Sequence, residues 1–115
     1  MTFHFDCLFY YVADLDRAIR FYSDVLRFQL LSRDAVARFD VDGVLFELVP
    51  SSAHAFTGKG NARLCLRVDN LAEARRDLQA NGVCVDTVED KGAGLLAALH
   101  DPDGNEVCLW QYANR

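Results

Sequence analysis

An internal repeat limits the folds open to this chain more than any other feature. The segment Tyr11-Val12-Ala13-Asp14-Leu15 in the first half corresponds to Arg67-Val68-Asp69-Asn70-Leu71 in the second. In both halves the segment leads from the end of an expected strand into an expected helix, after which three more strands are expected. Self-similarity of this kind indicates one structural unit built twice. We therefore expect an α+β fold of two βαβββ modules, with module 1 at about residues 1–50, a linker at about 51–61 and module 2 at about 62–115.

The first module is defined by alternating apolar residues and by capping and turn signals. Residues 5–12 are rich in aromatic and β-branched types, which favour a strand. Asp14 is a good N-cap, and apolar residues recur at helical spacing from Leu15 to Leu26. Asp42-Gly43 is a two-residue hairpin signal. The remaining strands of this module are expected at residues 27–32, 37–41 and 44–50.

The second module repeats this order. Asn70 should cap a helix from Leu71 to Asn81, with Gly82 as its stop signal. The turn Asp101-Pro102-Asp103-Gly104-Asn105 precedes the last strand. In it the proline fixes φ, the glycine permits a positive φ, and the Asp and Asn side chains bond nearby backbone groups. Strands are expected at residues 63–68, 83–88, 95–100 and 107–110, with a further turn at residues 90–94.

Each expected sheet has one face that its single helix can cover and a second face that needs another partner. Two modules can supply that second face to each other and enclose a cleft. Side chains alternate between the faces along a strand, and the polar, aromatic and sulfur-bearing strand residues share one face. We expect these residues to line the cleft and bind a ligand: Cys7, Phe9, Tyr11, Glu47, Arg63, Cys65, Arg67, Glu106, Cys108 and Trp110.

Charge and apolar content restrict the possible partners. With 12 basic and 17 acidic residues the net charge is −5, which argues against nucleic acid and anionic membranes because both attract basic surfaces. The apolar runs are far shorter than a membrane span, and the N-terminus has no signal-peptide pattern. The four cysteines have no CxxC spacing and are expected to be free thiols in a reducing compartment. We therefore expect a cytoplasmic protein with a small-molecule ligand.

Three segments carry a resemblance to a known family: residues 12–22 (VADLDRAIRFY), residues 43–48 (GVLFEL) and the turn at residues 101–105 (DPDGN). Together they make the chain resemble the vicinal oxygen chelate superfamily, which includes glyoxalase I, extradiol dioxygenases and bleomycin-resistance proteins. The resemblance covers essentially residues 1–115 as a single domain. It implies paired βαβββ modules around a U-shaped cleft and, very often, a homodimer. It does not fix the reaction, because this fold carries both enzymes and binding proteins.

The resemblance also implies positions for the divalent metal that enzymes of this superfamily hold. Carried over by position, the four ligand sites fall on Cys7, Glu47, Arg63 and Cys108. Only Glu47 keeps an expected ligand type, and Arg63 cannot bind a metal because its guanidinium stays protonated. This departure argues against glyoxalase or dioxygenase chemistry, and no cofactor is expected. We expect instead that Arg63 faces Glu47 within salt-bridge reach, directly or through a ligand, since Glu47 would otherwise need the metal charge.

Three functions remain open. The first is a small-molecule-binding protein without a catalytic metal, similar to the antibiotic-binding resistance branch of the superfamily. The second is a metal-dependent glyoxalase, lyase or dioxygenase with an atypical site of Glu47, Cys7 and Cys108. The third is a thiol-based sensor or detoxifier that uses Cys7 and Cys108, helped by arginines that lower a thiol pKa. The same two cysteines also fit the small buried hydrophobes that free cysteines usually are, and whether the chain is an enzyme is left open.

Overall fold

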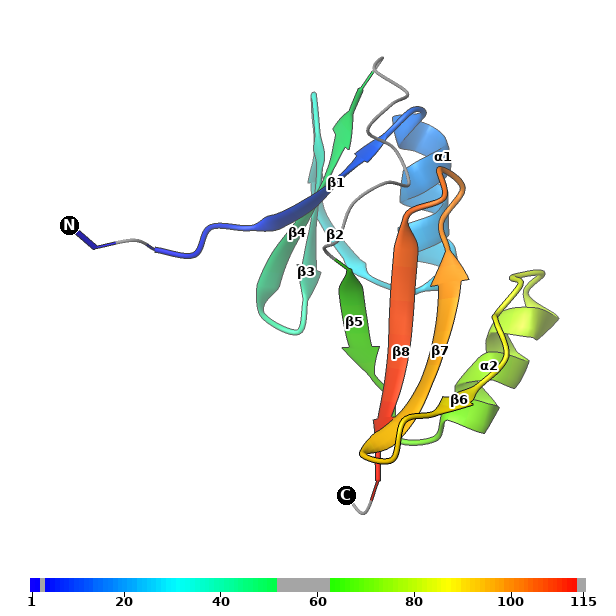
Figure 1. The fold of residues 1–115 in the computed structure, drawn as a ribbon. Helices are drawn as coiled ribbons and strands as arrows, with labels where there is room; N and C mark the ends of the chain where they lie inside the picture. The colour runs from blue at the N-terminus through cyan, green and yellow to red at the C-terminus, as the bar shows by residue number, and fades with distance from the viewer. Residues whose placement is uncertain (3, 52–62, 114–115) are drawn as a thin grey trace. The chain divides into compact units, whose positions relative to one another are not determined.

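The computed structural model describes residues 1, 2, 4–51 and 63–113. The chain divides into two compact units, unit 1 (Met1–Thr57) and unit 2 (Gly58–Arg115), and each contains a four-stranded sheet (Figure 1). The predicted α+β fold of two repeated modules is confirmed. All but the first residue of the predicted linker lies outside the described residues. Within the described ranges, no helix is long and apolar enough to cross a membrane.

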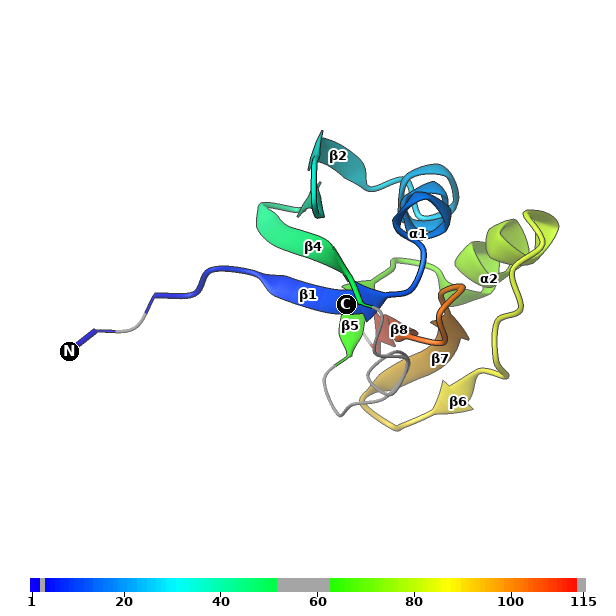
Figure 2. The ribbon, with the colours of Figure 1, turned by 90° about the horizontal axis from the view of Figure 1, so that it is seen from above.

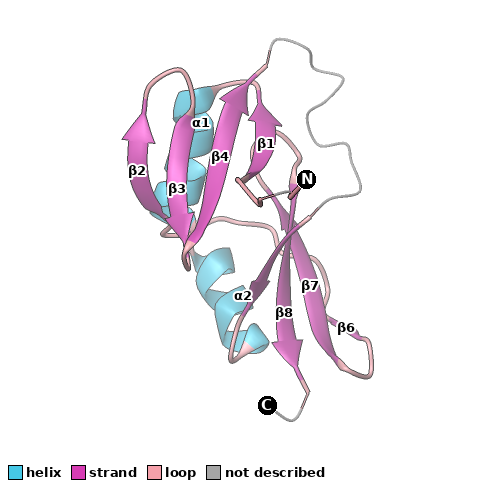
Figure 3. Cartoon of the chain, turned by 90° about the vertical axis from the view of Figure 1, so that its left-hand side faces the viewer, coloured by secondary structure: helices cyan, strands magenta, loops and turns pink. Residues whose placement is uncertain are grey.

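Unit 1 follows the predicted order of strand, helix and three strands. Its elements are β1 (Leu8–Val12), α1 (Leu15–Arg20), the π-helical segment η1 (Phe21–Val25), β2 (Gln29–Arg33), β3 (Ala37–Val41) and β4 (Val44–Pro50). The strand order is β1-β4-β3-β2, in which β1 runs parallel to β4 and the other pairs are antiparallel. Figure 3 views this sheet with α1 behind it, so the helix covers one face.

The first helix has the expected extent but changes its winding halfway. Asp14 caps it as predicted, because its Oδ1 accepts a hydrogen bond of 3.1 Å from the backbone N of Arg17. After α1 the helix continues as η1, where the N–H of Leu26 donates to the carbonyl of Phe21, five residues back. A π-wound turn holds more residues than an α-turn. Apolar periodicity predicts the helix but not this wider turn.

An aromatic cluster forms the core of unit 1. Tyr22 in η1 is fully buried, and its ring centroid lies 5.0 Å from that of Phe46 and 5.7 Å from that of Phe28. Phe39 is also fully buried, and its centroid lies 6.3 Å from those of Tyr22 and Phe46. Aromatic pairs at such distances contribute about 0.5–1.5 kcal/mol each beyond their burial. This cluster buries one face of the sheet in the core, so only the other face is available to bind a ligand.

The β3–β4 hairpin is set by its two-residue turn. Asp42 and Gly43 both have positive φ, 54° and 85°, as a type I′ turn requires. The turn therefore forms where the sequence predicts it. It fixes the register of the two strands so that Arg38 lies directly opposite Glu47.

Unit 2 repeats the order of unit 1. Its elements are β5 (Leu64–Arg67), α2 (Leu71–Ala80), β6 (Glu89–Asp90), β7 (Gly94–His100) and β8 (Glu106–Tyr112). The strand order is β5-β8-β7-β6, in which β5 runs parallel to β8 and the other pairs are antiparallel. The helix α2 lies on one face of this sheet (Figure 2). Asn70 caps α2 as predicted, because its side chain accepts a hydrogen bond of 3.0 Å from the backbone N of Glu73.

The predicted strand at residues 83–88 is wrong. Between α2 and β6 the chain forms one isolated bridge, from Val85 to Leu99, and one hydrogen bond of 2.8 Å from the backbone N of Asp86 to β7. The Arg75 guanidinium donates to the carbonyl oxygens of Val85 and Asp86, at 3.2 Å each. Because a side chain satisfies these carbonyls, they do not require a strand partner. The two residues of β6 alone complete the sheet edge.

Three other strand limits differ from the predicted ones. β1 begins at Leu8 rather than at residue 5. Gly94 opens β7, although the sequence places it in a turn. β8 extends to Tyr112, two residues beyond the predicted end. The remaining strand and helix limits agree with the prediction to within two residues.

The turn before β8 has the chemistry predicted from its sequence. Asp101 Oδ1 accepts hydrogen bonds from the backbone N–H groups of Asp103, at 2.9 Å, and Asn105, at 2.8 Å. Its Oδ2 accepts a hydrogen bond of 2.9 Å from the Asn105 amide, and Gly104 has a φ of 84°. Asp101 and Asn105 are both buried. Buried polar groups that satisfy one another hold a turn in a single conformation, so β8 starts from a fixed point.

The two sheets have a short or irregular strand at one edge. β2 pairs with β3 through a register shift between Leu30 and Ser32, which places a bulge at Leu31. In unit 2 the corresponding edge strand, β6, contains two residues. Bulges and short strands interrupt the row of unpaired backbone groups at the edge of a sheet.

Candidate functional site

The face of each sheet opposite its helix carries the residues predicted to bind a ligand. Strand residues alternate between fully buried ones, such as Phe46 and Val107, and half-buried or exposed ones such as Glu47 and Cys108. We call the surfaces made by the second set the helix-free faces. In unit 1 the helix-free face includes Phe9, Tyr11, Arg38 and Glu47. Cys7 comes just before β1, and the charges of Glu47 and Arg38 act on its thiol. In unit 2 it comprises Arg63, Cys65, Arg67, Glu106, Cys108 and Trp110.

A row of polar contacts crosses the helix-free face of unit 1. Arg38 Nε lies 3.5 Å from Glu47 Oε2. Arg38 Nη1 lies 3.1 Å from Asp34 Oδ2 and 3.4 Å from Ser32 Oγ. The Glu47 side chain is only 17% exposed, so its charge is partly removed from water and requires a cation nearby. Arg38 supplies that cation from the neighbouring strand.

Arg38 is a site residue that sequence reasoning missed. A signal for it exists in the hairpin, because counting outward from the turn at residues 42–43 brings residue 38 opposite residue 47. Alternation along β3 then puts Arg38 on the face away from the buried Ala37 and Phe39. A register count across the predicted hairpin therefore identifies the pair.

The predicted salt bridge between Arg63 and Glu47 stays a prediction, because the two residues belong to different units. Arg63 forms an ion pair with Glu106 of its own unit, through Nε and Oε2. Glu47 is paired with Arg38. Glu47 therefore has a cation within its own unit, which was not predicted from the sequence. Each of these two carboxylates has an arginine partner within its own unit.

Phe9 and Tyr11 form an aromatic edge on the helix-free face of unit 1. Their side chains are 44% and 37% exposed, which is high for aromatic residues within a strand. The ring centroids lie 5.3 Å apart in an edge-to-face arrangement. Phe9 is also the direct β1 neighbour of Glu47 on β4. Exposed apolar groups beside a fixed charge are typical of surfaces that bind a ligand.

Unit 2 places three side-chain pairs in succession along β5 and β8. The pairs are Arg63–Glu106, Cys65–Cys108 and Arg67–Trp110. The first is an ion pair, the second places two free thiols opposite each other, and the third places a cation opposite an aromatic residue. Successive pairs on one face of a strand are separated by about 6.5–7 Å. A ligand that lies along β8 would therefore meet three kinds of chemistry in order.

Trp110 is held in close contact with a glycine. A Cβ added to Gly94 would lie 2.5 Å from Trp110 Cζ2 and 2.5 Å from the carbonyl oxygen of Gln111. Only a glycine lets the indole and the β8 backbone approach β7 this closely. The ring centroids of Trp110 and Tyr112 lie 5.6 Å apart in an edge-to-face arrangement. Sequence reasoning assigned Gly94 to a turn and missed its packing role.

The surroundings of the thiols on the helix-free faces raise their pKa values. Burial raises the pKa of Cys7, and nearby carboxylates raise it further. Burial also raises the pKa of Cys65. For Cys108, burial and the neighbouring Cys65 raise the pKa, and the charge of Arg63 opposes this shift without cancelling it. Arginines do act to lower the pKa of Cys7 and Cys108, as predicted, but burial is the larger effect and the net shift of both is upward.

The residues at the carried-over metal positions do not fit the usual divalent-metal set. Cys7 and Glu47 belong to unit 1, whereas Arg63 and Cys108 belong to unit 2. The guanidinium of Arg38 lies beside Glu47, and a guanidinium offers no lone pair to a metal. Across the part of the chain that the structure describes, no three His, Cys, Asp or Glu side chains gather closely enough to hold a metal ion.

A depression of about 240 Å³ borders the helix-free face of unit 2. Its lining includes Arg63, Glu106 and Cys108, together with Leu96 and Ala98 of β7. Sites for drug-sized ligands usually measure about 300–1,000 Å³. The depression therefore fits a smaller ligand or one part of a larger one.

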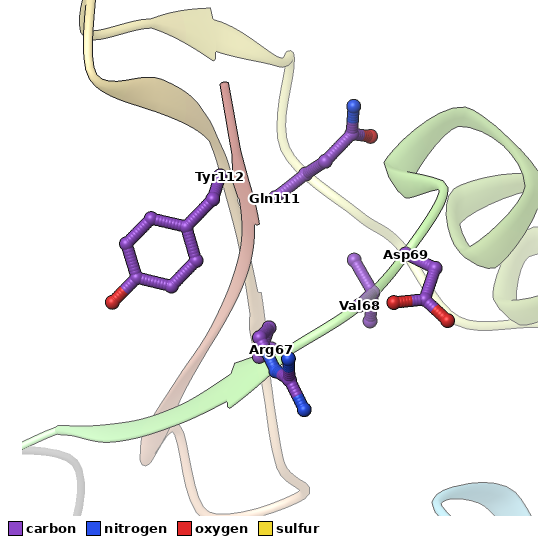
Figure 4. A pocket seen from close by; sticks show the side chains of 5 residues that line it. All are labelled: Arg67, Val68, Asp69, Gln111 and Tyr112. Atoms are coloured by element: carbon purple, nitrogen blue, oxygen red, sulfur yellow. The ribbon is translucent and has the colours of Figure 1, made fainter. Parts of the chain in front are cut away.

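A second depression, of about 60 Å³, lies where β5 ends beside β8. Figure 4 shows Gln111 and Tyr112 pointing to opposite sides of β8 there. Gln111 Oε1 accepts a hydrogen bond of 2.7 Å from the backbone N of Leu71. Gln111 is therefore occupied in supporting the start of α2, and this space is too small for more than a few atoms.

Known proteins share this fold and, in part, this sequence. The family model of the Glyoxalase/Bleomycin resistance protein/Dioxygenase superfamily matches residues 4–109. TnmS3, an antibiotic binding protein from Streptomyces sp. CB03234, is 26% identical, with a TM-score of 0.78 over 98% of this chain and 100% of that chain. A glyoxalase/bleomycin resistance protein from the same organism is 28% identical, with a TM-score of 0.70 over 92% of this chain and 100% of that one.

A more distant structure shares the fold alone. The fosfomycin resistance protein FosX from Listeria monocytogenes is 13% identical, with a TM-score of 0.80 over 99% of this chain and 97% of that chain. No curated protein matches the sequence.

Proposed function

Because the chain belongs to the Glyoxalase/Bleomycin resistance protein/Dioxygenase superfamily, we propose that it is a small-molecule-binding member that lacks the usual metal-ligand set. Its ligand is an antibiotic or toxin, and binding confers resistance. The observation that carries this proposal is the pairing of Arg38 with Glu47. The pair puts the guanidinium of Arg38 beside Glu47, which is the only one of the four implied metal-ligand positions with the residue type expected in the superfamily.

A guanidinium beside Glu47 replaces the charge of a metal but not its chemistry. It balances the carboxylate and presents N–H donors in a fixed plane. It offers no open coordination position with which to polarise a substrate oxygen or activate water. A site of this kind can orient and hold a polar group of a ligand, which favours binding over Lewis-acid catalysis.

Aromatic surface supplies the second part of the proposed binding chemistry. Phe9 and Tyr11 are exposed beside Glu47, and Trp110 is placed on the corresponding face of unit 2. Aromatic faces beside fixed charges suit a ligand with a flat apolar body and polar substituents. The similarity to an antibiotic binding protein over nearly the whole chain supports this type of ligand.

Tryptophan fluorescence tests the proposal directly, because Trp110 is the single tryptophan of the chain. Titration with bleomycin and with a panel of aromatic antibiotics should change the Trp110 emission and raise the unfolding temperature for at least one compound. Tyr11→Ala should weaken that binding by about tenfold or more, since it removes a large aromatic contact. Leu31→Ala, which shortens an exposed apolar side chain on β2, is the matched control and should bind as the wild type does.

The opposite result would identify a metalloenzyme. No binding across the panel, together with turnover of a hemithioacetal or catechol that requires added metal and is lost in Glu47→Ala, would contradict the proposal. Elemental analysis of protein prepared without a histidine tag should accompany both assays.

We propose further that the protein is a cytoplasmic homodimer. Support comes from the superfamily, from the four free thiols, and from exposed large apolar side chains on both units, among them Phe9, Val44 and Tyr112. Light scattering at micromolar concentration should give twice the chain mass of 12.9 kDa. A mass near that of one chain would contradict the dimer and leave the ligand-binding proposal intact.

A further inference from the structure

Cys65 and Cys108 lie directly opposite each other on two parallel strands. Their Cα atoms are partners in the β5–β8 register, so both thiols share the helix-free face of unit 2. Cys65 is exposed, Cys108 is half-buried, and both are free thiols. Sequence reasoning grouped Cys108 with Cys7, which belongs to unit 1. The structure gives Cys108 a different neighbour, and the two thiols together form a site that the proposed function does not use.

The spacing of the strands decides what two such thiols can do. Neighbouring strands lie about 4.7–4.9 Å apart, and the Cβ atoms of directly opposed residues in a parallel pair are separated by nearly the same distance. A disulfide needs Cβ atoms about 3.5–4.5 Å apart. A direct S–S bond would therefore draw the strands together against their hydrogen bonds. An atom placed between the two sulfurs spans the wider gap without moving the backbone.

The charges around the two thiols favour an anionic complex. Arg63 and Arg67 stand two positions before and after Cys65 on the same face. The charge of Arg63 already acts on the Cys108 thiol. Two thiolates that share one monovalent cation carry a net charge of minus one. Arg67 stabilises that charge, whereas Arg63 shares its own charge with Glu106 on the same face.

We propose that Cys65 and Cys108 form a two-thiol site for a soft monovalent metal ion of low coordination number, with Cu(I) as its ligand. Thiolates select Cu(I) among the biological metals. Binding forms two Cu–S bonds and releases the two thiol protons to solvent, while copper stays monovalent and neither sulfur is oxidised. Zinc fits this site less well, because it usually takes four ligands and the residues that the structure describes offer no cluster of three suitable donors.

Copper binding at this site exchanges protons for the metal ion, because a thiol must lose its proton to become a ligand. Protonated thiols react slowly with alkylating agents and disulfides. A soft metal ion overcomes this protection, since each Cu–S bond replaces an S–H bond. The site therefore gains affinity as the pH rises, with up to two protons released for each ion bound.

A titration of freshly reduced protein with Cu(I) under anaerobic conditions, against the coloured chelator bicinchoninate, tests the site. The wild type should bind one Cu(I) per chain in competition with the chelator. Cys65→Ser and Cys108→Ser should each weaken binding by about tenfold or more, since the second thiolate acts at high effective concentration. Cys84→Ser, which changes another exposed thiol, is the matched control and should bind as the wild type does.

The flanking charge has its own test. Arg67→Gln should weaken Cu(I) binding by about two- to fivefold, the effect of one partly exposed charge. X-ray absorption at the copper edge of the loaded wild type should show two sulfur neighbours, which does not depend on any variant remaining folded. Unchanged binding in both Cys65→Ser and Cys108→Ser, loss of binding in Cys84→Ser, or a copper shell without two sulfurs would each overturn the assignment. None of these outcomes bears on the antibiotic titration.

Discussion

The two units place different chemistry at the same positions of the same register. The row across the helix-free face of unit 1, from β1 through β4 to β3, is Phe9, Glu47 and Arg38. The corresponding row of unit 2, from β5 through β8 to β7, is Cys65, Cys108 and Ala98. An aromatic residue beside an ion pair thus corresponds to two thiols beside an alanine. Strand pairing decides where a side chain lies, and the residue type alone decides what it can do there.

The charged pairs of the two units also differ in what fixes them. The pair in unit 1 crosses the antiparallel strands β3 and β4, whose register is set by a tight turn. The pair in unit 2 joins Arg63, just before β5, to Glu106 at the start of β8. Glu47 is 17% exposed and Glu106 is 29% exposed. The pair in unit 1 is the less solvated of the two and should contribute more to stability.

The largest expected loss of stability comes from a substitution at Gly94. It has no counterpart in unit 1, because none of the four described strands of that unit contains a glycine. Gly94→Ala should lower the free energy of unfolding by about 1–3 kcal/mol, because the new Cβ overlaps Trp110 and the β8 backbone. The same overlap should shift the emission of Trp110. Denaturant unfolding followed by circular dichroism and by tryptophan fluorescence measures both effects.

Gly92→Ala is the control for that experiment. Gly92 has a φ of 82° and nothing within 4 Å of an added Cβ, so alanine there is strained by its backbone alone, at about 1–2 kcal/mol. It should leave the Trp110 emission unchanged. If Gly94→Ala also left the emission unchanged, the contact between Gly94 and Trp110 would be wrong.

The next largest effect should distinguish the two ion pairs by how much each contributes to the free energy of unfolding. Arg38→Met should lower the free energy of unfolding by about 1–3 kcal/mol, because it leaves the half-buried carboxylate of Glu47 with one fewer cation. Adding Glu47→Gln should recover a good part of that loss. The same pair of changes at Arg63 and Glu106 should show a coupling of about 0.2–1 kcal/mol, as is usual for exposed pairs.

Two double-mutant cycles, measured by thermal unfolding, give the two coupling energies. A larger coupling energy in unit 2 than in unit 1 would contradict the expectation that the pair in unit 1 contributes more to stability. Additive losses in unit 1 would mean that Arg38 does not balance Glu47, and the argument for the proposed function would lose its main observation.

The smallest expected effect is a pH dependence in unit 1. The backbone N of Val36, at 3.1 Å, and then the Arg38 guanidinium hold the pKa of Asp34 below its usual value. Its folded pKa is therefore lower than its unfolded pKa near 4. The stability from Asp34 is present above that pH and is lost as the pH falls through the folded pKa. Thermal unfolding from pH 7 to pH 2 should show a steeper acid loss for the wild type than for Asp34→Asn, and parallel curves would contradict this.

The fold could be predicted from local signals because each one has a local physical cause. Asp14 and Asn70 cap their helices through their own side chains, the turn at residues 42–43 needs positive φ at both positions, and the turn at residues 101–105 satisfies its own polar groups. Alternation along the strands likewise separates core residues from those on the helix-free faces. These causes act within a few residues, so the chain displays them directly.

The features that were not predicted from the sequence depend on contacts between segments far apart in the chain. The predicted strand at 83–88 fails because Arg75, on another element, takes two of its carbonyl groups. The partner of Glu47 requires the register of a whole hairpin, and the role of Gly94 requires the position of an indole on the next strand. Capping and alternation do not contain this information. The neighbour of Cys108 was missed for the same reason, because it lies more than forty positions back in the chain.

The bulge at Leu31 and the two-residue strand β6 bear on how this protein behaves when it is crowded. An incoming chain adds to a sheet by pairing with a long, flat row of free N–H and C=O groups, and growth of that kind leads to fibres. At β2 the row is broken by the bulge, and at β6 it is only two residues long. An incoming copy therefore finds no long template at β2 or β6, so high expression and prolonged storage should not convert the protein into fibrous aggregates that start from these two strands.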